Sequence, residues 1–376
     1  MQTPTPSRIA PIALGTALAL AATTAAADTE VNLFGQAQLE VLDYRDSHDD
    51  VDADDYELTD NTAGELGVEV REDLGHGRAL FARYAFRVNT ATSRVDADGD
   101  SSEMVLGMEG GFGTLTGGHL PSPYAHTGGQ SYDAFADTTL GAASNGGMTG
   151  NERPLLSGRV DAAHHATVRR ALGYRNRGER VELWAAASRD SDDTGLDETD
   201  DRADDGEQGD TAVSLRTFGD DWELFAATTT QRRASVVDEN DNTSHRRFRT
   251  HKVGGRYIGG NHVWSAQYEV FESEDRGTDP GMDNADTYTG DQEGTAWFLG
   301  YQYDFAPNVF VVQLGAQDME YGNGDEADAT YVATGFIHRI SDESRLFAGY
   351  RRTSVDDDLG GDYNQRAFSV GLTHRF

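Results

Sequence analysis

The chain has 376 residues, and its 65 acidic side chains outnumber 31 basic ones, for a formal net charge of −34. Such an excess of carboxylates argues against nucleic-acid binding, which needs clustered cations opposite the phosphates. The absence of cysteine rules out disulfides as a source of stability. A single lysine, Lys252, among so many acids suits a halophilic, high-salt habitat, where ions screen the self-repulsion.

The N-terminal stretch has the pattern of an export signal. An apolar run over 9–22 is followed by three alanines, at 25–27, which suit a signal-peptidase cleavage site. The run is too short for a membrane-spanning helix, and Pro11 interrupts it. We therefore expect residues 1–27 to be a cleaved signal peptide and residues 28–376 to form a single mature domain.

Beyond this stretch, apolar and polar residues alternate over segments of about ten residues, a pattern typical of β-strands whose two faces meet different surroundings. In the first segment Leu33, Leu39 and Val41 fall on one face, whereas Gln38 and Glu40 fall on the other. The pattern predicts sixteen strands, at 30–43, 62–73, 78–88, 102–110, 113–120, 164–176, 180–189, 210–218, 221–232, 247–258, 262–273, 294–305, 308–319, 329–340, 344–355 and 363–376.

The connections between these segments are alternately short and long. Seven tight turns at one end and eight longer loops at the other predict an all-β fold, a transmembrane antiparallel up-and-down barrel with its tight turns toward the periplasm. A closed barrel leaves no unpaired backbone edge in lipid. A soluble sandwich or propeller is disfavoured, because its strands would be shorter and because no blade repeat is present. The short turns lie at 73–77, 111–113, 177–179, 219–221, 259–261, 306–308 and 341–344.

Three stretches carry a resemblance to a known family. They are "GELGVEVREDLGHGRALF" (64–81), "MVLGMEGGFGTLTGGHLPSPY" (104–124) and "FSVGLTHRF" (368–376). In this order they resemble two hairpins and the terminal strand of Gram-negative trimeric porins. The resemblance implies a homotrimer in the cell outer membrane, embedded in lipid and lipopolysaccharide. It also implies that the third loop, at about 121–163, folds into the lumen and narrows it.

In such porins, acidic residues of the third loop face cationic side chains on the barrel wall, which produces a transverse field across the constriction. The matching acids of this loop are Asp133 and Asp137, in "SYDAFADTTL", and Glu152. The resemblance therefore assigns these three carboxylates to the constriction.

The wall positions match the family less well. The family commonly has Arg before the Leu-Gly of its second strand, where this chain has Glu65. It commonly has Gly-Arg at the end of its fifth strand, where this chain has Gly118-His119. Arg159 and Arg169 compete for a third arginine, which opens the sixth strand in the family. With two wall cations lost, the transverse field is expected to weaken or rotate.

Other arginines restore part of the positive wall. Arg83 and Arg87 lie on the polar face of the third segment, and Arg351 lies opposite the apolar face of the penultimate one. The acidic loops raise the local concentration of cations at the mouth of the pore. Together these features predict a channel for ions and small hydrophilic solutes that prefers cations.

The chain ends on an aromatic residue, Phe376, within a strand-like alternation. We expect this last segment to pair with the first one and to close the barrel. In the family, such an ending also resembles the signal that the outer-membrane insertion machinery reads. Phe376 is therefore the predicted assembly signal.

Other functions stay open at this point. The barrel could be closed by its loops and act as a surface-binding or structural outer-membrane protein, or it could be a porin specific for one solute. An enzymatic barrel is disfavoured, because no set of Ser, His and Asp appears at a suitable spacing. The sequence predicts no cofactor and no metal site, and the pair His164-His165 is best explained by polar residues of a loop or lumen.

Overall fold

The computed structural model describes most of the chain, apart from its N-terminal end and parts of several long loops. The predicted signal peptide, Glu152 and Arg159 lie outside the described residues. The described segments are 29–46, 56–60, 63–92, 94–96, 103–142, 167–188, 209–235, 244–275, 291–358 and 361–376.

The described structure consists of β-strands that pair in antiparallel fashion, together with one 3-10 turn, η1 (Gly129–Ser131). Among the described residues, no helix has the length and apolar character needed to cross a membrane. The strands are β1 (Thr29–Asp46), β2 (Tyr56–Thr59), β3 (Glu65–Gly75), β4 (Arg78–Asn89), β5 (Arg94–Asp96), β6 (Glu103–Gly110), β7 (Gly113–Pro121), β8 (Thr167–Arg177), β9 (Val181–Ser188), β10 (Thr211–Phe218), β11 (Trp222–Ser235), β12 (Ser244–Gly259), β13 (His262–Asp275), β14 (Gln292–Phe305), β15 (Asn308–Tyr321), β16 (Glu326–Arg339), β17 (Ser344–Asp357) and β18 (Tyr363–Arg375).

Two of these eighteen strands are continuations of their neighbours. β2 and β3 pair with successive parts of β1, so they form one interrupted transmembrane strand. β5 and β6 pair in the same way with successive parts of β4. Subtracting the two continuations from eighteen leaves sixteen strands around the lumen. The predicted sixteen-stranded antiparallel barrel is confirmed.

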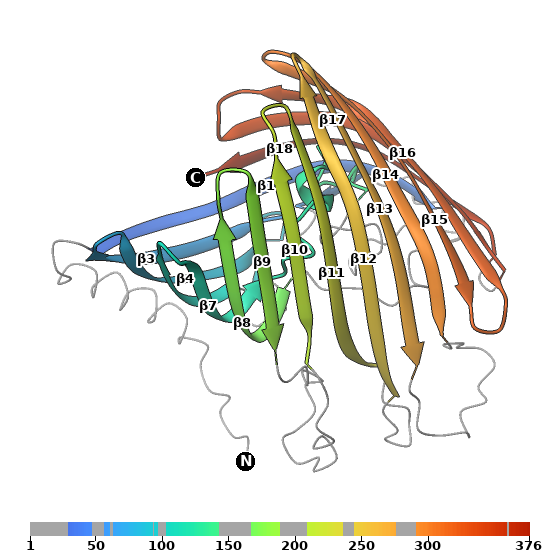
Figure 1. The fold of residues 1–376 in the computed structure, drawn as a ribbon. Helices are drawn as coiled ribbons and strands as arrows, with labels where there is room; N and C mark the ends of the chain where they lie inside the picture. Colours follow the sequence, from blue (N-terminus) through green and yellow to red (C-terminus); the bar gives the residue numbers. More distant parts are fainter. Residues whose placement is uncertain are drawn as a thin grey trace, which may run out of the picture.

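The barrel closes between its first and last strands. β18 pairs with residues 36–46 of β1, and the two strands run side by side in Figure 1. The terminal residue takes part, because Phe376 and Gly35 exchange backbone hydrogen bonds of 3.0 and 3.1 Å. The predicted pairing of the last segment with the first is confirmed, and the chain end is part of the sheet.

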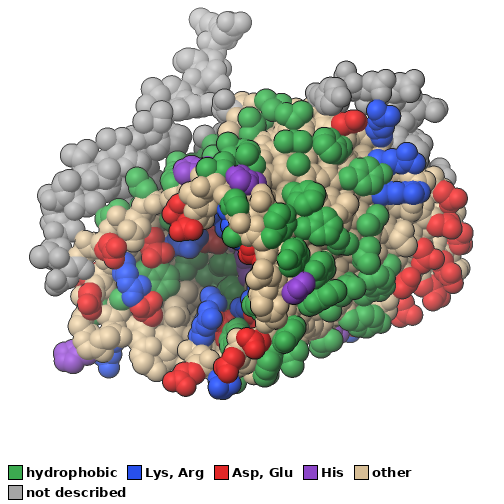
Figure 2. Space-filling view, turned by 90° about the horizontal axis from the view of Figure 1, so that it is seen from above, with side chains coloured by type: hydrophobic (Ala, Val, Ile, Leu, Met, Phe, Trp, Pro, Cys, Tyr) green, Lys and Arg blue, Asp and Glu red, His purple; other side chains and the backbone are tan. Residues whose placement is uncertain are grey.

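The two faces of each strand meet different surroundings. On β18 the side chains of Phe368, Val370 and Leu372 are exposed on the outer surface, whereas Ser369 and Thr373 are buried on the lumen side. Figure 2 shows the same division across the molecule, with hydrophobic side chains gathered on the outer surface and charged side chains of both signs around a hollow. An apolar exterior around a polar interior is what a barrel in lipid requires.

The third loop follows β7 and enters the barrel, as the family resemblance implied. Its described part is 122–142, in which Tyr124, Phe135 and Leu140 are completely buried. Phe135 and Leu140 belong to one apolar cluster with inward-facing side chains of the wall, such as Phe298. The loop therefore packs against the inside of the barrel and occupies part of the lumen.

Candidate functional site

Tyr124 fixes the beginning of the third loop to the wall. Its hydroxyl donates a hydrogen bond of 2.5 Å to Glu269 on β13, and the Lys252 ammonium on β12 lies 4.2 Å from the centre of its ring. Lys252 and Glu269 are direct cross-strand partners, and both side chains are buried. Burial raises the pKa of Tyr124 well above its ordinary value, so the hydroxyl remains a hydrogen-bond donor.

Tyr132 and Gly129 make a second set of contacts further along the loop. The Tyr132 hydroxyl donates to Glu223 on β11 at 3.1 Å, and its ring meets Phe225 edge-on with the centroids 5.4 Å apart. The backbone N–H of Gly129 donates to the side-chain oxygen of Gln267 on β13 at 2.7 Å. Burial raises the pKa of Tyr132 as well, so this hydroxyl also remains a donor.

Asp133, one of the predicted constriction acids, is buried and organises the loop itself. Its Oδ1 accepts hydrogen bonds from the Phe135 N–H at 2.8 Å and from Gln313 Nε2 on β15 at 2.6 Å. Its Oδ2 accepts from the Ala142 N–H at 2.7 Å. Because both oxygens act only as acceptors, a carboxylate suits this position better than an amide.

The far part of the loop reaches β1. The backbone N–H of Thr139 donates to the Glu40 carboxylate at 3.1 Å, and Ser369 on β18 donates to the same carboxylate at 2.7 Å. Gln38 Nε2 donates to the backbone carbonyl oxygen of Asp137 at 2.5 Å. With its contacts to β11, β13 and β15, the loop therefore covers one side of the inner wall.

A row of alternating charges follows the inner wall from β8 to β12, near the short turns. Glu182 on β9 lies 2.8 Å from Arg175 and 3.2 Å from Arg216. Glu223 on β11 lies 2.7 Å from Arg216 and 3.0 Å from Arg256. Because each glutamate lies between two arginines, much of the positive potential of the row is neutralised locally.

A second charged group lies on β3, β4 and β6. Glu65 and Arg87 are direct cross-strand partners, and Arg83 Nε lies 2.9 Å from Glu103. The Arg83 guanidinium also lies 4.2 Å from the centre of the Phe34 ring. The structure thus brings Glu65, Arg83 and Arg87 together on the inner face, with carboxylates beside the arginines.

Two arginines that the sequence analysis did not assign to the site face the acids of the loop. Strand alternation was the signal that could have found one of them, since Arg345 shares the inward face of β17 with the predicted wall residue Arg351. Arg345 and Arg375 line a cavity of 350 Å³, whose other lining residues are His126, Ser131, Asp133, Ala136 and Asp137. The cavity therefore joins loop carboxylates to wall cations, which is the arrangement expected of a constriction.

The sequence model of one family, described as Gram-negative porin, matches residues 13–358. The chain belongs to the Gram-negative porin family. Membership of this family places the protein in the outer membrane and indicates a channel rather than an enzyme.

This porin is also similar to an individual outer-membrane protein over part of its length. The major outer membrane protein P.IB of Neisseria gonorrhoeae is 30% identical over 172 residues, which cover 42% of this chain and 46% of that protein. The match therefore spans less than half of the relative's length.

Solved structures show the same fold at low sequence identity. A loop L8 deletion mutant of OmpT from Vibrio cholerae has a TM-score of 0.67 and 15% identity, covering 93% of this chain and 100% of that one. In-vitro folded OmpT, described as a trimer form, has a TM-score of 0.64 and 14% identity, covering 93% and 99%. An anion-selective porin from Comamonas acidovorans has a TM-score of 0.65 and 16% identity, covering 93% and 100%.

His119 does not lie on the lumen wall of this porin, and its predicted role there is wrong. It is the cross-strand partner of Met104, whose side chain is 60% exposed on the outer face. The next residue, Leu120, is buried on the lumen side, so strand alternation directs His119 outward. Its Nε2 lies 2.6 Å from Thr167 Oγ1 on β8.

A β-bulge at the start of β8 determines where two neighbouring arginines lie in the porin. The pairing of β7 with β8 shifts between Gly118 and Leu120, so Arg169 and Arg170 together oppose a single residue. Arg170 adopts a left-handed backbone conformation, with φ of 48°. Simple alternation would have directed Arg170 toward lipid, and the bulge interrupts that alternation. Arg169, a candidate for the wall, lies inside this bulge.

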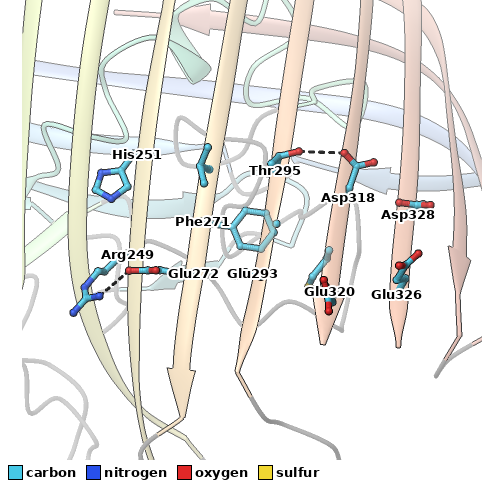
Figure 3. Close-up of a pocket in the computed structure, with 13 residues that line it drawn as sticks. Arg249, His251, Phe271, Glu272, Glu293, Thr295, Asp318, Glu320, Glu326 and Asp328 are labelled. Atoms are coloured by element: carbon cyan, nitrogen blue, oxygen red, sulfur yellow. Dashed lines mark hydrogen bonds and ion pairs between the residues drawn. The ribbon is translucent and has the colours of Figure 1, made fainter. Parts of the chain in front are cut away.

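A larger cavity, of 640 Å³, lies on the outer face of the porin where β12 to β16 approach the long loops. Figure 3 shows carboxylates of neighbouring strands beside one another there, with Arg249 2.7 Å from Glu272 and Thr295 donating to Asp318 at 3.1 Å. These residues alternate with the buried, inward-facing Phe271. Because they face away from the lumen, they belong to the acidic exterior and not to the channel.

Proposed function

We propose that this porin is a water-filled channel for the passive diffusion of ions and small hydrophilic solutes, with a preference for cations. The observation that supports the preference is that Glu182 and Glu223 each lie within 3.2 Å of two guanidinium groups, so carboxylates offset the wall arginines. The net charge of −34 then dominates the potential that an ion meets. A negative potential concentrates cations in the pore.

Reversal potentials across a planar bilayer test this preference. In a KCl gradient from about 0.1 M to about 1 M, the sign of the reversal potential should be that of a cation-preferring channel, and the permeability ratio should fall toward unity in a gradient from about 1 M to about 3 M, where salt screens the charges. Glu65→Gln should reduce the preference, whereas Glu179→Gln, in the exposed turn between β8 and β9, serves as the control.

Two results would contradict this function in different ways. A reversal potential of the opposite sign would show that the porin prefers anions. A folded barrel that gives no conductance steps would instead favour a closed barrel with a surface-binding or structural role.

The proposal includes a homotrimer surrounded by lipid and lipopolysaccharide. The support is the trimer form described for OmpT and the apolar outer face of this barrel, on which Leu33, Leu106 and Leu172 are 66–76% exposed in the single chain. Mass measurement in detergent should give three subunits, and a monomer would contradict the proposal. Leu106→Arg on β6 should weaken the assembly more than Leu314→Arg on β15, because Leu106 is 66% exposed in the single chain and Leu314 only 38%.

We also propose that the insertion machinery reads Phe376. Its backbone closes the sheet with Gly35, while its side chain is 55% exposed and so remains available to a partner. Deletion of Phe376 should reduce the yield in the outer membrane far more than deletion of Asp192 from an acidic loop. Equal yields, measured by fractionation and blotting, would rule out the proposal.

A further inference from the structure

The cavity between the third loop and the last two strands has the dimensions of a small solute site. Its volume of 350 Å³ lies at the lower end of the range found for small-molecule sites. Two of its lining residues, Arg345 and Arg375, come from the adjacent strands β17 and β18, and the others come from the loop. The site is therefore built from two separate parts of the chain that meet only in the folded barrel.

Arg345 has unused hydrogen-bonding capacity. In the part of the chain that the structure describes, its guanidinium makes no hydrogen bond or ion pair, although it lies within electrostatic range of Arg375, Asp133 and Asp137. Arg375 uses its Nε to donate to Gln36 at 2.7 Å. Two guanidinium groups facing one cavity repel each other, and an anion between them removes that repulsion. A guanidinium presents a planar fork of donors that matches a carboxylate.

The loop supplies the opposite charge. Asp133 and Asp137 line the same cavity, and Asp133 is held rigidly by the Phe135 and Ala142 N–H groups. The Ser131 hydroxyl donates to the carbonyl of Gly128 at 2.7 Å, which leaves its oxygen able to accept. A solute with two anionic ends would meet repulsion from these carboxylates. A solute with one carboxylate and one ammonium group matches both ends of the cavity.

We propose that this cavity binds small zwitterionic solutes in transit, with their carboxylate at Arg345 and Arg375 and their ammonium group toward Asp137. The proposal rests on the channel function proposed above and adds a solute class to it. Weak binding at the constriction raises flux at low solute concentration and makes it saturate at high concentration. The porin then conducts amino-acid-like solutes faster than neutral solutes of the same size.

Uptake into proteoliposomes tests the proposal with L-alanine as the zwitterion and glycerol as a neutral solute of similar size. After subtraction of the uptake by protein-free liposomes, alanine uptake through the wild-type porin should exceed glycerol uptake at low concentration and should saturate, whereas glycerol uptake should rise linearly. Arg345→Gln and Arg375→Gln should each lower the alanine-to-glycerol ratio about three- to tenfold, because each removes a charge-assisted contact. Arg345→Lys keeps the positive charge but lacks the planar fork of donors of a guanidinium. Its alanine-to-glycerol ratio should lie between those of the wild type and Arg345→Gln.

Arg352→Gln is the matched control. Arg352 lies on the same strand but on the outward face, where it donates to Asn364 at 3.0 Å, so its removal changes the net charge equally and leaves the cavity intact. The alanine-to-glycerol ratio of Arg352→Gln should equal that of the wild type. Heat-modifiable migration on gels verifies that each variant is folded. If Arg345→Gln does not fold, the alanine-to-glycerol ratios of Arg375→Gln and Arg345→Lys test the zwitterion site instead.

An unchanged ratio in the folded Arg345 and Arg375 variants would overturn the zwitterion site, and so would equal uptake of alanine and glycerol by the wild type. Neither result affects the channel itself. The channel function would fail separately, if the folded porin gave no conductance steps in a planar bilayer.

Discussion

The two sides of the inner wall are built differently. On the side that the third loop covers, aromatic side chains fill the space between loop and wall, and Phe135 and Leu140 are completely buried there. On the side formed by the earlier strands, arginines and glutamates pair with one another, as Arg83 does with Glu103. The first side is a small hydrophobic core inside a barrel, and the second is a charged surface that faces the lumen.

The difference separates two properties of the pore. Apolar burial contributes stability and holds the loop in place, so it determines how wide the pore is. Partly solvated ion pairs contribute little stability but shape the potential in the lumen. Changes on the covered side should therefore alter pore size and current noise, whereas changes on the charged side should alter ion selectivity.

The largest effect is expected from Phe135→Ala on the covered side. Loss of a completely buried phenylalanine costs about 3–5 kcal/mol of packing free energy, which should release the loop from the wall. Single-channel recording should then show a larger and noisier conductance. Phe112→Ala, in the exposed turn between β6 and β7, should leave the conductance unchanged. A wild-type conductance in the Phe135 variant would show that the loop does not define the pore.

A smaller effect is expected from Tyr124→Phe. The change removes the hydroxyl that donates to Glu269 and leaves the ring beside Lys252, at a cost of about 1.5–3 kcal/mol for a hydrogen bond to a charged group. Open-channel noise should rise while the mean conductance stays near that of the wild type. Tyr174→Phe loses a hydroxyl contact to the Phe112 carbonyl outside the loop, and its noise should not change.

The smallest structural effect is expected from Arg83→Gln on the charged side. Its ion pair with Glu103 is partly solvated, so the stability of the barrel should change by about 1 kcal/mol or less. The ratio of potassium to chloride permeability should nevertheless rise about twofold, because a wall cation is lost. Arg180→Gln, in an exposed turn, tests whether net charge alone has this effect. Equal shifts in both variants would show that the position of Arg83 is unimportant.

Strand number and closure could be predicted because both follow from local pattern. Each lipid-facing position must be apolar, and side chains on a strand alternate with a period of two, so Phe368 and Ser369 report their faces directly. The breaks that separate β2 from β3 and β5 from β6, and the bulge at Arg169, could not be predicted from this alternation. A bulge inserts one residue into the ladder without changing composition, so alternation misplaces its neighbours.

The site was harder to predict than the fold. Asp133 and Asp137 were expected near wall cations, and they line a cavity with Arg345 and Arg375, which come from the opposite end of the chain. His119 was expected on the wall through the resemblance, although its own alternation with Leu120 directs it outward. For the location of the His119 side chain, the face of the strand was therefore a better guide than its position in the family pattern.

By itself the sequence determined that sixteen alternating strands form a barrel, which faces are apolar, and that Phe376 ends the strand that closes the sheet. The physical reason is that lipid accepts only apolar surfaces and paired backbone, and both requirements are met within each strand and its neighbour. Only the tertiary structure decided which polar side chains meet across the lumen. Those meetings depend on the path of the third loop, which is set by packing against residues far away in the chain, such as Phe298 and Gln313.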